Sequence, residues 1–241
     1  MSKIFFVMPA YNEAENIEET VRQWYPVVEG VARSGGNCAR LIIANDGSKD
    51  ETYSILLGLK DRYPLLEPLD KINSGHGATL LFLYRYAIEK ECDFVFQTDS
   101  DGQTAPDEFW QMWDKRDDYD FQIGFRKDRE DGLGRLFVTK VLRWLVWLMF
   151  HEWVIDANTP FRLMKVDKLK AILNVIPQDY FLCNVAISAI AKKWKYRIEW
   201  QKISFKPRQG GVNSINMKRI FQIGWKAISD FRIINDKINN K

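Results

Sequence analysis

The 241-residue sequence contains few of the residues that staple small proteins or bind zinc. It has three cysteines and two histidines. Cys38, Cys92 and Cys183 are far apart and form no C-x-x-C or Cys/His spacing, so the pattern indicates neither a disulfide framework nor a zinc site. A reducing compartment is the simplest interpretation.

The sequence also lacks a strong excess of either charge. The formal net charge is +3, which is too weak to indicate a nucleic-acid partner unless basic residues gather on one face, and they cluster only late in the chain. The hydrophobic content of 46% is ample for a continuous core. One large α/β domain is therefore a better expectation than two small ones.

No uninterrupted hydrophobic run is long enough to cross a bilayer. The most apolar stretch, 136–155, is broken by Lys140, Arg143, His151 and Glu152. The N-terminus has no signal-peptide pattern, and we find no repeat, low-complexity tract or linker. We therefore expect a cytoplasmic protein without a transmembrane anchor.

The first half of the sequence alternates short apolar runs with helical patterns, which is typical of βα units and a mainly parallel sheet. Asn12 with Glu15, and Ser48 with Glu51, have the spacing of capping boxes and predict helix starts. The second half is less regular, with a loop at 156–160 and a terminal helix. Strands are expected at 3–8, 40–45, 65–69, 93–98 and 119–125, an extended segment at 196–205, and helices at 78–91, after 134 and at 180–193.

Polar residues follow three of the predicted strands, at the sheet edge where open α/β proteins bind ligands. The segment Thr98 to Gln103 (T-D-S-D-G-Q) places Asp99 and Asp101 one residue apart after an apolar strand. Both carboxylates can reach one hard cation, Gln103 offers a further oxygen, and Mg²⁺ or Mn²⁺ bound there can hold a diphosphate. The plainer interpretation is a polar turn that caps a helix entered at Pro106.

The residues after two other predicted strands can likewise be interpreted either as part of a ligand site or as a plain structural turn. Asp46, followed by Gly47 and Ser48, can accept hydrogen bonds from a nucleoside or can simply form a turn and helix cap. The segment 9–13 (P-A-Y-N-E) is either a strand-to-helix turn or a wall of a nucleotide pocket. The segment 73–77 (N-S-G-H-G) can offer backbone amides to phosphate, although it lacks the P-loop spacing.

These segments, in this order and spacing, resemble glycosyltransferase family 2, the inverting enzymes with a Rossmann-like GT-A fold. The resemblance is strongest to the branch with dolichol-phosphate mannosyltransferase and bacterial polyprenyl-phosphate glycosyltransferases, and it runs from Ile4 to about Ser214. It is carried by Pro9 to Glu13, Asp46 to Ser48, Asp99 to Gln103, Gly124 to Arg126 with Arg129 and Arg135, Asp156 with Pro160 to Arg162, and Pro207-Arg208 with Gly211 and Asn213-Ser214.

The resemblance implies roles for individual positions. The donor site would hold a nucleoside-diphosphate sugar, with Asp99, Asp101 and Gln103 binding the metal and Asp101, Arg126 and Arg135 serving catalysis. This chain has His76 and Asn213 where the family often has Lys and Ser. The implied donor-binding set is Pro9, Tyr11, Glu13, Ala44, Asp46, Asp99, Ser100, Asp101, Gln103, Arg126, Arg208 and Ser214.

The acceptor is expected to be a polyprenyl phosphate, because an anionic phosphate needs orientation and neutralisation rather than a general base. The processive-synthase motif Q-x-x-R-W is absent. One alternative is a saccharide hydroxyl in capsule or lipopolysaccharide synthesis, with Asp156 or Asp179 as base. Others are a nucleotidyltransferase, which would need a basic glycine-rich loop after the first strand, and a non-catalytic nucleotide-sugar-binding domain.

The C-terminal part predicts a second unit after a 1–214 catalytic domain. In 215–241 an apolar stripe that includes Met217, Phe221 and Phe231 stands apart from basic residues, as in helices that adsorb to anionic membranes. The 136–151 segment interleaves cations with Trp147 in a similar way. Packing on the domain, a homo-oligomer contact and peripheral membrane contact all remain open for these segments.

Overall fold

The protein is seen in a computed structural model that describes residues 1–126, 143–144, 146–206, 231, 234–235 and 237–238. The predicted site residues Arg135, Arg208 and Ser214 lie outside the described residues. So do the 214/215 domain boundary and most of the expected terminal helix.

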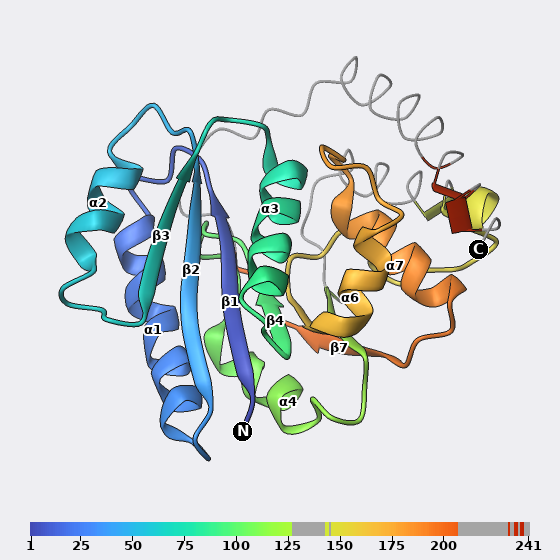
Figure 1. Ribbon diagram of the computed structural model, residues 1–241, viewed down its shortest axis with the longest axis horizontal. Coiled ribbons are helices and arrows are strands. Elements are labelled where there is room, and N and C mark those ends of the chain that lie inside the picture. The colour runs from blue at the N-terminus through green and yellow to red at the C-terminus, as the bar shows by residue number, and fades with distance from the viewer. Residues whose placement is uncertain (127–142, 145, 207–230, 232–233, 236, 239–241) are drawn as a thin grey trace.

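One seven-stranded sheet runs through the molecule in the order β3-β2-β1-β4-β6-β5-β7. Its part β3-β2-β1-β4 can be followed in Figure 1. All neighbouring strands are parallel except β6, which runs antiparallel to β4 and β5. The predicted α/β class with a mainly parallel sheet is thus confirmed. The strands are β1 (Lys3–Ala10), β2 (Cys38–Asp46), β3 (Leu66–Lys71), β4 (Phe94–Gln97), β5 (Phe121–Arg126), β6 (Arg162–Lys165) and β7 (Ile198–Ile203).

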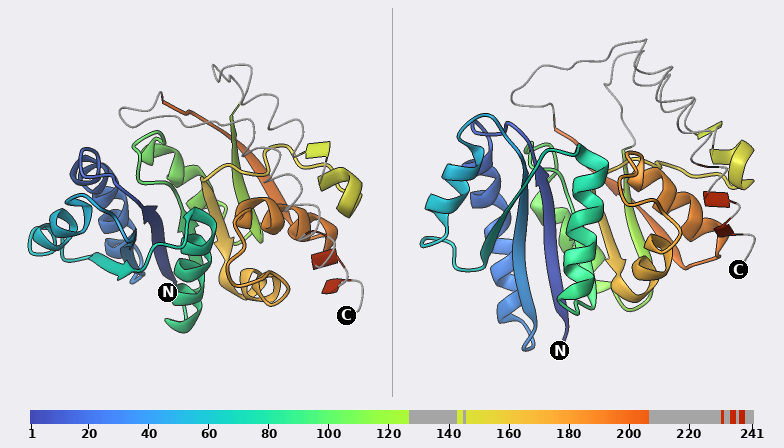
Figure 2. Two further views of the ribbon diagram at one scale, coloured as in Figure 1. Left: turned by 90° about the horizontal axis from the view of Figure 1, so that it is seen from above. Right: turned by 45° about the horizontal axis from the view of Figure 1, so that its top comes forward.

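Helices cover both faces of the sheet, giving three layers (Figures 1 and 2). Alternate residues of β1 point to opposite faces: Phe6 joins a core with α1, α2 and α4, whereas Val7 joins a core with α3, α6 and α7. Burial on both faces explains why the strands read as continuous apolar runs. The helices are α1 (Ile17–Arg33), α2 (Thr52–Leu59), α3 (His76–Glu89), α4 (Phe109–Asp114) after the 3₁₀ turn Pro106–Glu108, α6 (Val166–Leu173) and α7 (Cys183–Lys193).

The two predicted capping boxes are wrong. Helix α1 begins at Ile17 and α2 at Thr52, and neither has a side-chain cap hydrogen bond from its N-cap residue. Instead the two turns bind each other: the Asn12 amide donates to Ser48 Oγ at 3.0 Å, and the Lys49 amide donates to Asn12 Oδ1 at 2.8 Å. These contacts hold the ends of β1 and β2 together at the carboxyl edge of the sheet.

The described residues near the C-terminus pack onto the domain. Phe231, Ile234 and Ile238 are buried in the core on the α3, α6 and α7 side, and the Phe231 ring lies 5.2 Å from that of Phe150. Within the part of the chain that the structure describes, no helix has the length and apolarity needed to span a bilayer.

Candidate functional site

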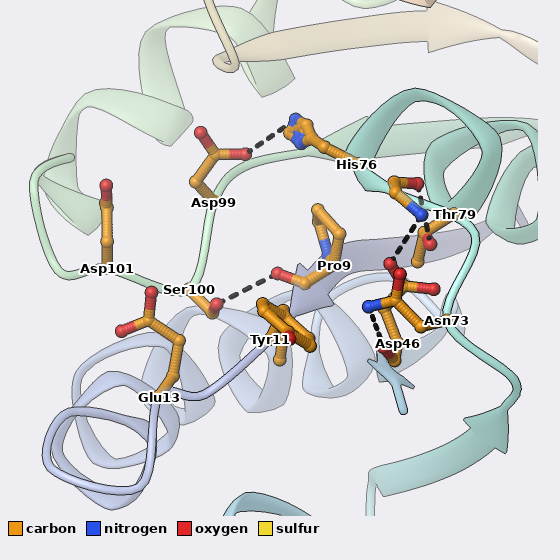
Figure 3. A pocket seen from close by; sticks show the side chains of 12 residues that line it. Pro9, Tyr11, Glu13, Asp46, Asn73, His76, Thr79, Asp99, Ser100 and Asp101 are labelled. Atoms are coloured by element: carbon orange, nitrogen blue, oxygen red, sulfur yellow. Dashed lines mark hydrogen bonds and ion pairs between the residues drawn. The ribbon is translucent and has the colours of Figure 1, made fainter. Parts of the chain in front are cut away.

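A cavity of about 550 Å³ opens at the carboxyl ends of β1, β2 and β4 (Figure 3). Its volume falls in the range of small-molecule sites, and its position is the one that open α/β sheets use for ligands. The lining residues are Pro9, Ala10, Tyr11, Glu13, Asp46, Asn73, Gly75, His76, Thr79, Asp99, Ser100 and Asp101.

Asp46 is the last residue of β2 and lines the cavity. Hydrogen-bond donors within the protein compensate the negative charge of its carboxylate. Its Oδ1 accepts from Lys71 Nζ and from the Ser74 amide at 2.9 Å, and its Oδ2 accepts from the Gly75 amide at 2.8 Å. Burial alone would raise the pKa of Asp46, but these donors hold it below its usual value. Asp46 therefore shapes the loop after β3 as well as facing the cavity.

Gly47 lets this loop approach the turn after β2. Its φ of +62° lies in the left-handed region, and a Cβ there would sit 2.7 Å from the Asn73 amide nitrogen. Asn73 Nδ2 in turn donates to the Asp46 carbonyl at 2.7 Å. The loop is thus fixed so that the first turn of α3, with His76 and Thr79, lines the cavity.

Asp99 and Asp101 flank a residue whose backbone and side chain are both anchored. Ser100 Oγ donates to the Pro9 carbonyl at 2.9 Å, and the Ser100 carbonyl accepts from Thr20 Oγ1 at 2.9 Å. With Ser100 tied to β1 and α1, both carboxylates are presented at the cavity (Figure 3). Two anchored carboxylates are a donor set that suits a hard divalent cation.

The remaining ligands of such a cation would have to come from outside the protein. Among the residues that the structure describes, no group of three or more His, Cys, Asp and Glu side chains is arranged to hold a metal ion. Magnesium commonly binds through one or two carboxylates together with substrate phosphates. The pair Asp99 and Asp101 fits that mode of binding.

His76 faces the same carboxylates from α3. Its Nε2 lies 3.6 Å from Asp99 Oδ1, and about half of the side chain stays exposed. Partial desolvation in the cavity lowers the pKa of His76, while the carboxylates of Asp46 and Asp101 act in the opposite direction. A largely neutral imidazole at pH 7 is a hydrogen-bond donor and acceptor rather than a fixed positive charge.

Gln103 connects this loop to the end of β7. Its Nε2 donates to the Lys206 carbonyl at 2.9 Å, and the Lys206 amide donates to the Gln103 carbonyl at 2.8 Å. Gln103 is buried and does not line the cavity. Its expected part as a metal ligand stays a prediction.

Arg126 ends β5 outside the cavity lining, where Asp156 and Phe205 help to orient it. Its Nε lies 3.3 Å from Asp156 Oδ2, and its guanidinium carbon lies 4.6 Å from the centre of the Phe205 ring. The loop that carries Asp156 is held by the buried Arg162, which donates to the Ala157 and Thr159 carbonyls at 2.6 and 2.7 Å. A chain of contacts from the start of β6 therefore sets the position of Arg126.

The structure brings together most of the predicted donor-site residues, but not all. Pro9, Tyr11, Glu13, Asp46, Asp99, Ser100 and Asp101 line one cavity, while Ala44 lies buried inside β2. Asn73, Gly75 and His76, from the segment expected to offer amides to phosphate, also line the cavity. Ala10 and Thr79 line it without having been predicted as site residues, and the available signal was that they closely follow Pro9 and the glycine-containing loop in the sequence.

The same architecture occurs in a solved protein. A glucosyl-3-phosphoglycerate synthase from Mycobacterium tuberculosis, crystallised with Mn²⁺, UDP-glucose and phosphoglyceric acid, superposes with a TM-score of 0.71 at 17% identity, over 98% of this chain and 80% of that chain. This likeness places the fold in the GT-A class. The chain belongs to glycosyl transferase family 2, whose family model matches residues 5–173, and it is therefore a glycosyltransferase.

Two curated relatives are similar over most of this chain. A UDP-N-acetylglucosamine–dolichyl-phosphate N-acetylglucosaminyltransferase from Methanococcus voltae is 25% identical over 81% of this chain and 82% of its own length. A dolichyl-phosphate beta-glucosyltransferase from Trichomonas vaginalis is 25% identical over 82% of this chain. This chain spans only 65% of the latter protein's length.

Proposed function

We propose that this glycosyltransferase moves a sugar from a nucleoside-diphosphate donor to a polyprenyl or dolichyl phosphate, with a divalent cation at Asp99 and Asp101. The observation that carries the proposal is the meeting of these two carboxylates with Tyr11 and Asp46 in one cavity of nucleotide size. The dolichyl-phosphate transferases among the relatives support the acceptor class.

The nucleoside would occupy the part of the cavity between the ends of β1 and β2. Tyr11 offers an aromatic face that is nearly half exposed, and base stacking on such a face is favourable. Pro9 and Glu13 would form the wall beside it. Asp46 would act through the loop 73–75 that it holds, because both of its carboxylate oxygens already accept hydrogen bonds from that loop and from Lys71.

The cation, Mg²⁺ or Mn²⁺, would neutralise the charge that develops on the departing nucleoside diphosphate. Asp99 and Asp101 would hold it together with the diphosphate oxygens, and His76 would lie beside Asp99 as a donor to phosphate. The similar glucosyl-3-phosphoglycerate synthase, which was crystallised with Mn²⁺ and UDP-glucose, supports this arrangement. Gln103 would keep the loop of Asp101 attached to the segment after β7.

The acceptor phosphate would approach Arg126, with Arg135 as the second predicted contact. A lipid phosphate attacks as an anion and needs no general base. The saccharide alternative needs one, and its candidate Asp156 is buried with its carboxylate on Arg126. That contact favours an orienting part for Asp156, whose carboxylate is already engaged by the guanidinium of Arg126. Peripheral membrane contact and a homo-oligomer remain compatible with this function.

The test is release of nucleoside diphosphate from UDP- and GDP-sugars, measured with Mn²⁺ or Mg²⁺ and with or without a short polyprenyl phosphate. We expect release that requires both metal and lipid phosphate. Asp101→Asn should lower kcat by about 100-fold or more, because one charged metal ligand is lost. Wild-type turnover in Asp101→Asn would refute the metal assignment, and release only with a saccharide acceptor would refute the lipid-phosphate assignment.

A further inference from the structure

A cluster of exposed tryptophans stands out from the rest of the described surface. Of the nine large hydrophobic side chains that are exposed among the described residues, five fall within 144–155. Monomeric proteins seldom expose so many together without an interaction that uses them. We call these five the tryptophan surface: Trp144 is 61% exposed, Trp147 43%, Leu148 58%, Trp153 48% and Ile155 37%.

The segment that carries the tryptophan surface is already anchored on its other side. Val146, Phe150 and Val154, spaced by four residues, are buried in the core, and the Phe150 ring packs against Phe231. Trp144 and Trp147 lie together, with ring centroids 5.6 Å apart. A segment that is apolar on its buried side and also on its exposed side is expected to meet a second apolar environment.

The charges around the tryptophan surface favour a lipid bilayer as that environment. The Arg143 guanidinium binds the Ile155 carbonyl, and the Lys192 ammonium binds the Trp153 carbonyl. Glu152 is the sole acidic residue within 143–155. Tryptophans with cations at their margin match the interface of an anionic bilayer, where indole rings sit at headgroup depth and cations meet lipid phosphates.

The tryptophan surface also directly precedes in sequence the residue that contacts Arg126 at the expected acceptor end of the site. Asp156 directly follows Ile155, and its carboxylate lies 3.3 Å from Nε of Arg126. A lipid phosphate at Arg126 therefore has an apolar surface next to it along the chain. We propose that the tryptophan surface docks the protein on an anionic lipid bilayer and so presents Arg126 to acceptors in that bilayer. The inference rests on the proposed lipid-phosphate acceptor.

The direct test is flotation of the full chain with vesicles of phosphatidylcholine containing about 30% phosphatidylglycerol, chosen for the negative surface potential of such membranes. The variant Trp144→Ser/Trp147→Ser/Leu148→Ser should reduce the vesicle-bound fraction at least about tenfold, because it removes apolar area that would enter the interface. Leu148→Ser alone should reduce it several-fold. Leu57→Ser, which removes a similarly exposed leucine from α2, should leave it unchanged.

Turnover measured with two acceptors separates this inference from the proposed function. With monomeric geranyl phosphate in solution, the triple variant should keep wild-type activity, whereas it should lose activity on a long polyprenyl phosphate in vesicles. If the wild-type protein floated with the vesicles but turned over neither acceptor, the lipid-phosphate acceptor would be refuted, whereas the docking surface would be retained. Three outcomes would overturn the docking surface. The first is a wild-type protein that fails to float with the vesicles, and the second is a triple variant that floats as well as the wild type. In the third outcome, the only change in the triple variant is dissociation of a dimer in solution.

Discussion

Asp46 illustrates how a residue at a strand end serves the site through its neighbours. The sequence predicted a contact to the nucleoside, whereas the structure adds three donors from the protein to its carboxylate. The Ser74 and Gly75 amides both donate to this carboxylate. Removing the carboxylate would therefore loosen the loop that positions Asn73 at the cavity. An effect of mutation on donor affinity is therefore expected even without a direct contact to the donor.

The lowered pKa of Asp46 makes a prediction about acid stability. A carboxyl group whose pKa is lower in the folded than in the unfolded protein stabilises the fold above its unfolded pKa, near 4, and this stabilisation is lost as the pH falls through the folded pKa. Asp46→Asn should be less stable at pH 7 by roughly 3 kcal/mol, since Lys71 loses its buried partner. Its stability should also fall less steeply below about pH 4.

Urea unfolding of both proteins between about pH 3 and pH 7 measures these two effects together. Asp61→Asn, at an exposed position after α2, is the control and should follow the wild-type curve. Equal pH dependence in wild type and Asp46→Asn would show that Asp46 does not contribute to acid unfolding.

Strands were more predictable from the sequence than helix starts, and the reason is physical. Strands β1, β2 and β4 are buried on both faces, so their apolar runs are unmistakable. Helix starts depend on caps, and here the polar groups of Asn12 and Ser48 bind across the gap between two turns instead of capping their own helices. A contact between residues that are 36 positions apart leaves no local pattern.

Strand β6 was missed for a related reason. It has four residues, Arg162–Lys165, and its antiparallel pairing with β4 and β5 is decided by tertiary packing. An arginine in the sequence suggests an exposed position, yet Arg162 is fully buried. Its burial is possible because its guanidinium donates to carbonyls of the 157–159 loop, to the Asn184 carbonyl and to Ser188 Oγ. Burial of arginine on backbone carbonyls is not encoded by hydrophobic periodicity.

Helix α3 approaches the backbone before α7 so closely that only glycine fits at its second residue. A Cβ at Gly77 would lie 2.3 Å from the Phe181 carbonyl oxygen, so backbone would have to move. We expect Gly77→Ala to cost roughly 2 kcal/mol of unfolding free energy, and to raise the KM for the donor because His76 is the adjacent residue. Urea unfolding and donor titration measure the two effects.

The matched control is Gly58→Ala in α2. A Cβ at Gly58 meets no atom within 4 Å, so alanine should stabilise that helix by about 0.5–1 kcal/mol. If the two variants had the same stability, the close approach of α3 to Phe181 would not hold in solution.

The cavity is assembled from parts of the molecule that are distant in sequence. Residues from the ends of β1, β2 and β4 and from the start of α3 must be in place together, and Ser100 and Asp46 link them by hydrogen bonds to Pro9 and to the loop after β3. A ligand that spans these parts binds the folded protein and not the unfolded chain. Its binding free energy must then appear as stability of the whole domain.

This linkage predicts the thermal response to the expected product of donor cleavage. A nucleoside diphosphate at about 100 times its Kd should add about 2.7 kcal/mol of stability, which corresponds to a rise in Tm of about 5–10 °C for a protein of this size. The rise should require Mn²⁺ or Mg²⁺, because the carboxylates Asp99 and Asp101 would otherwise repel the diphosphate. Scanning fluorimetry with UDP and GDP, with metal or with a chelator, measures this rise in Tm.

Uridine and guanosine serve as controls whose smaller effect on Tm should not depend on metal, and Asp101→Asn should abolish the metal-dependent part of the rise. A shift that is equal with metal and chelator would place the diphosphate away from these two carboxylates.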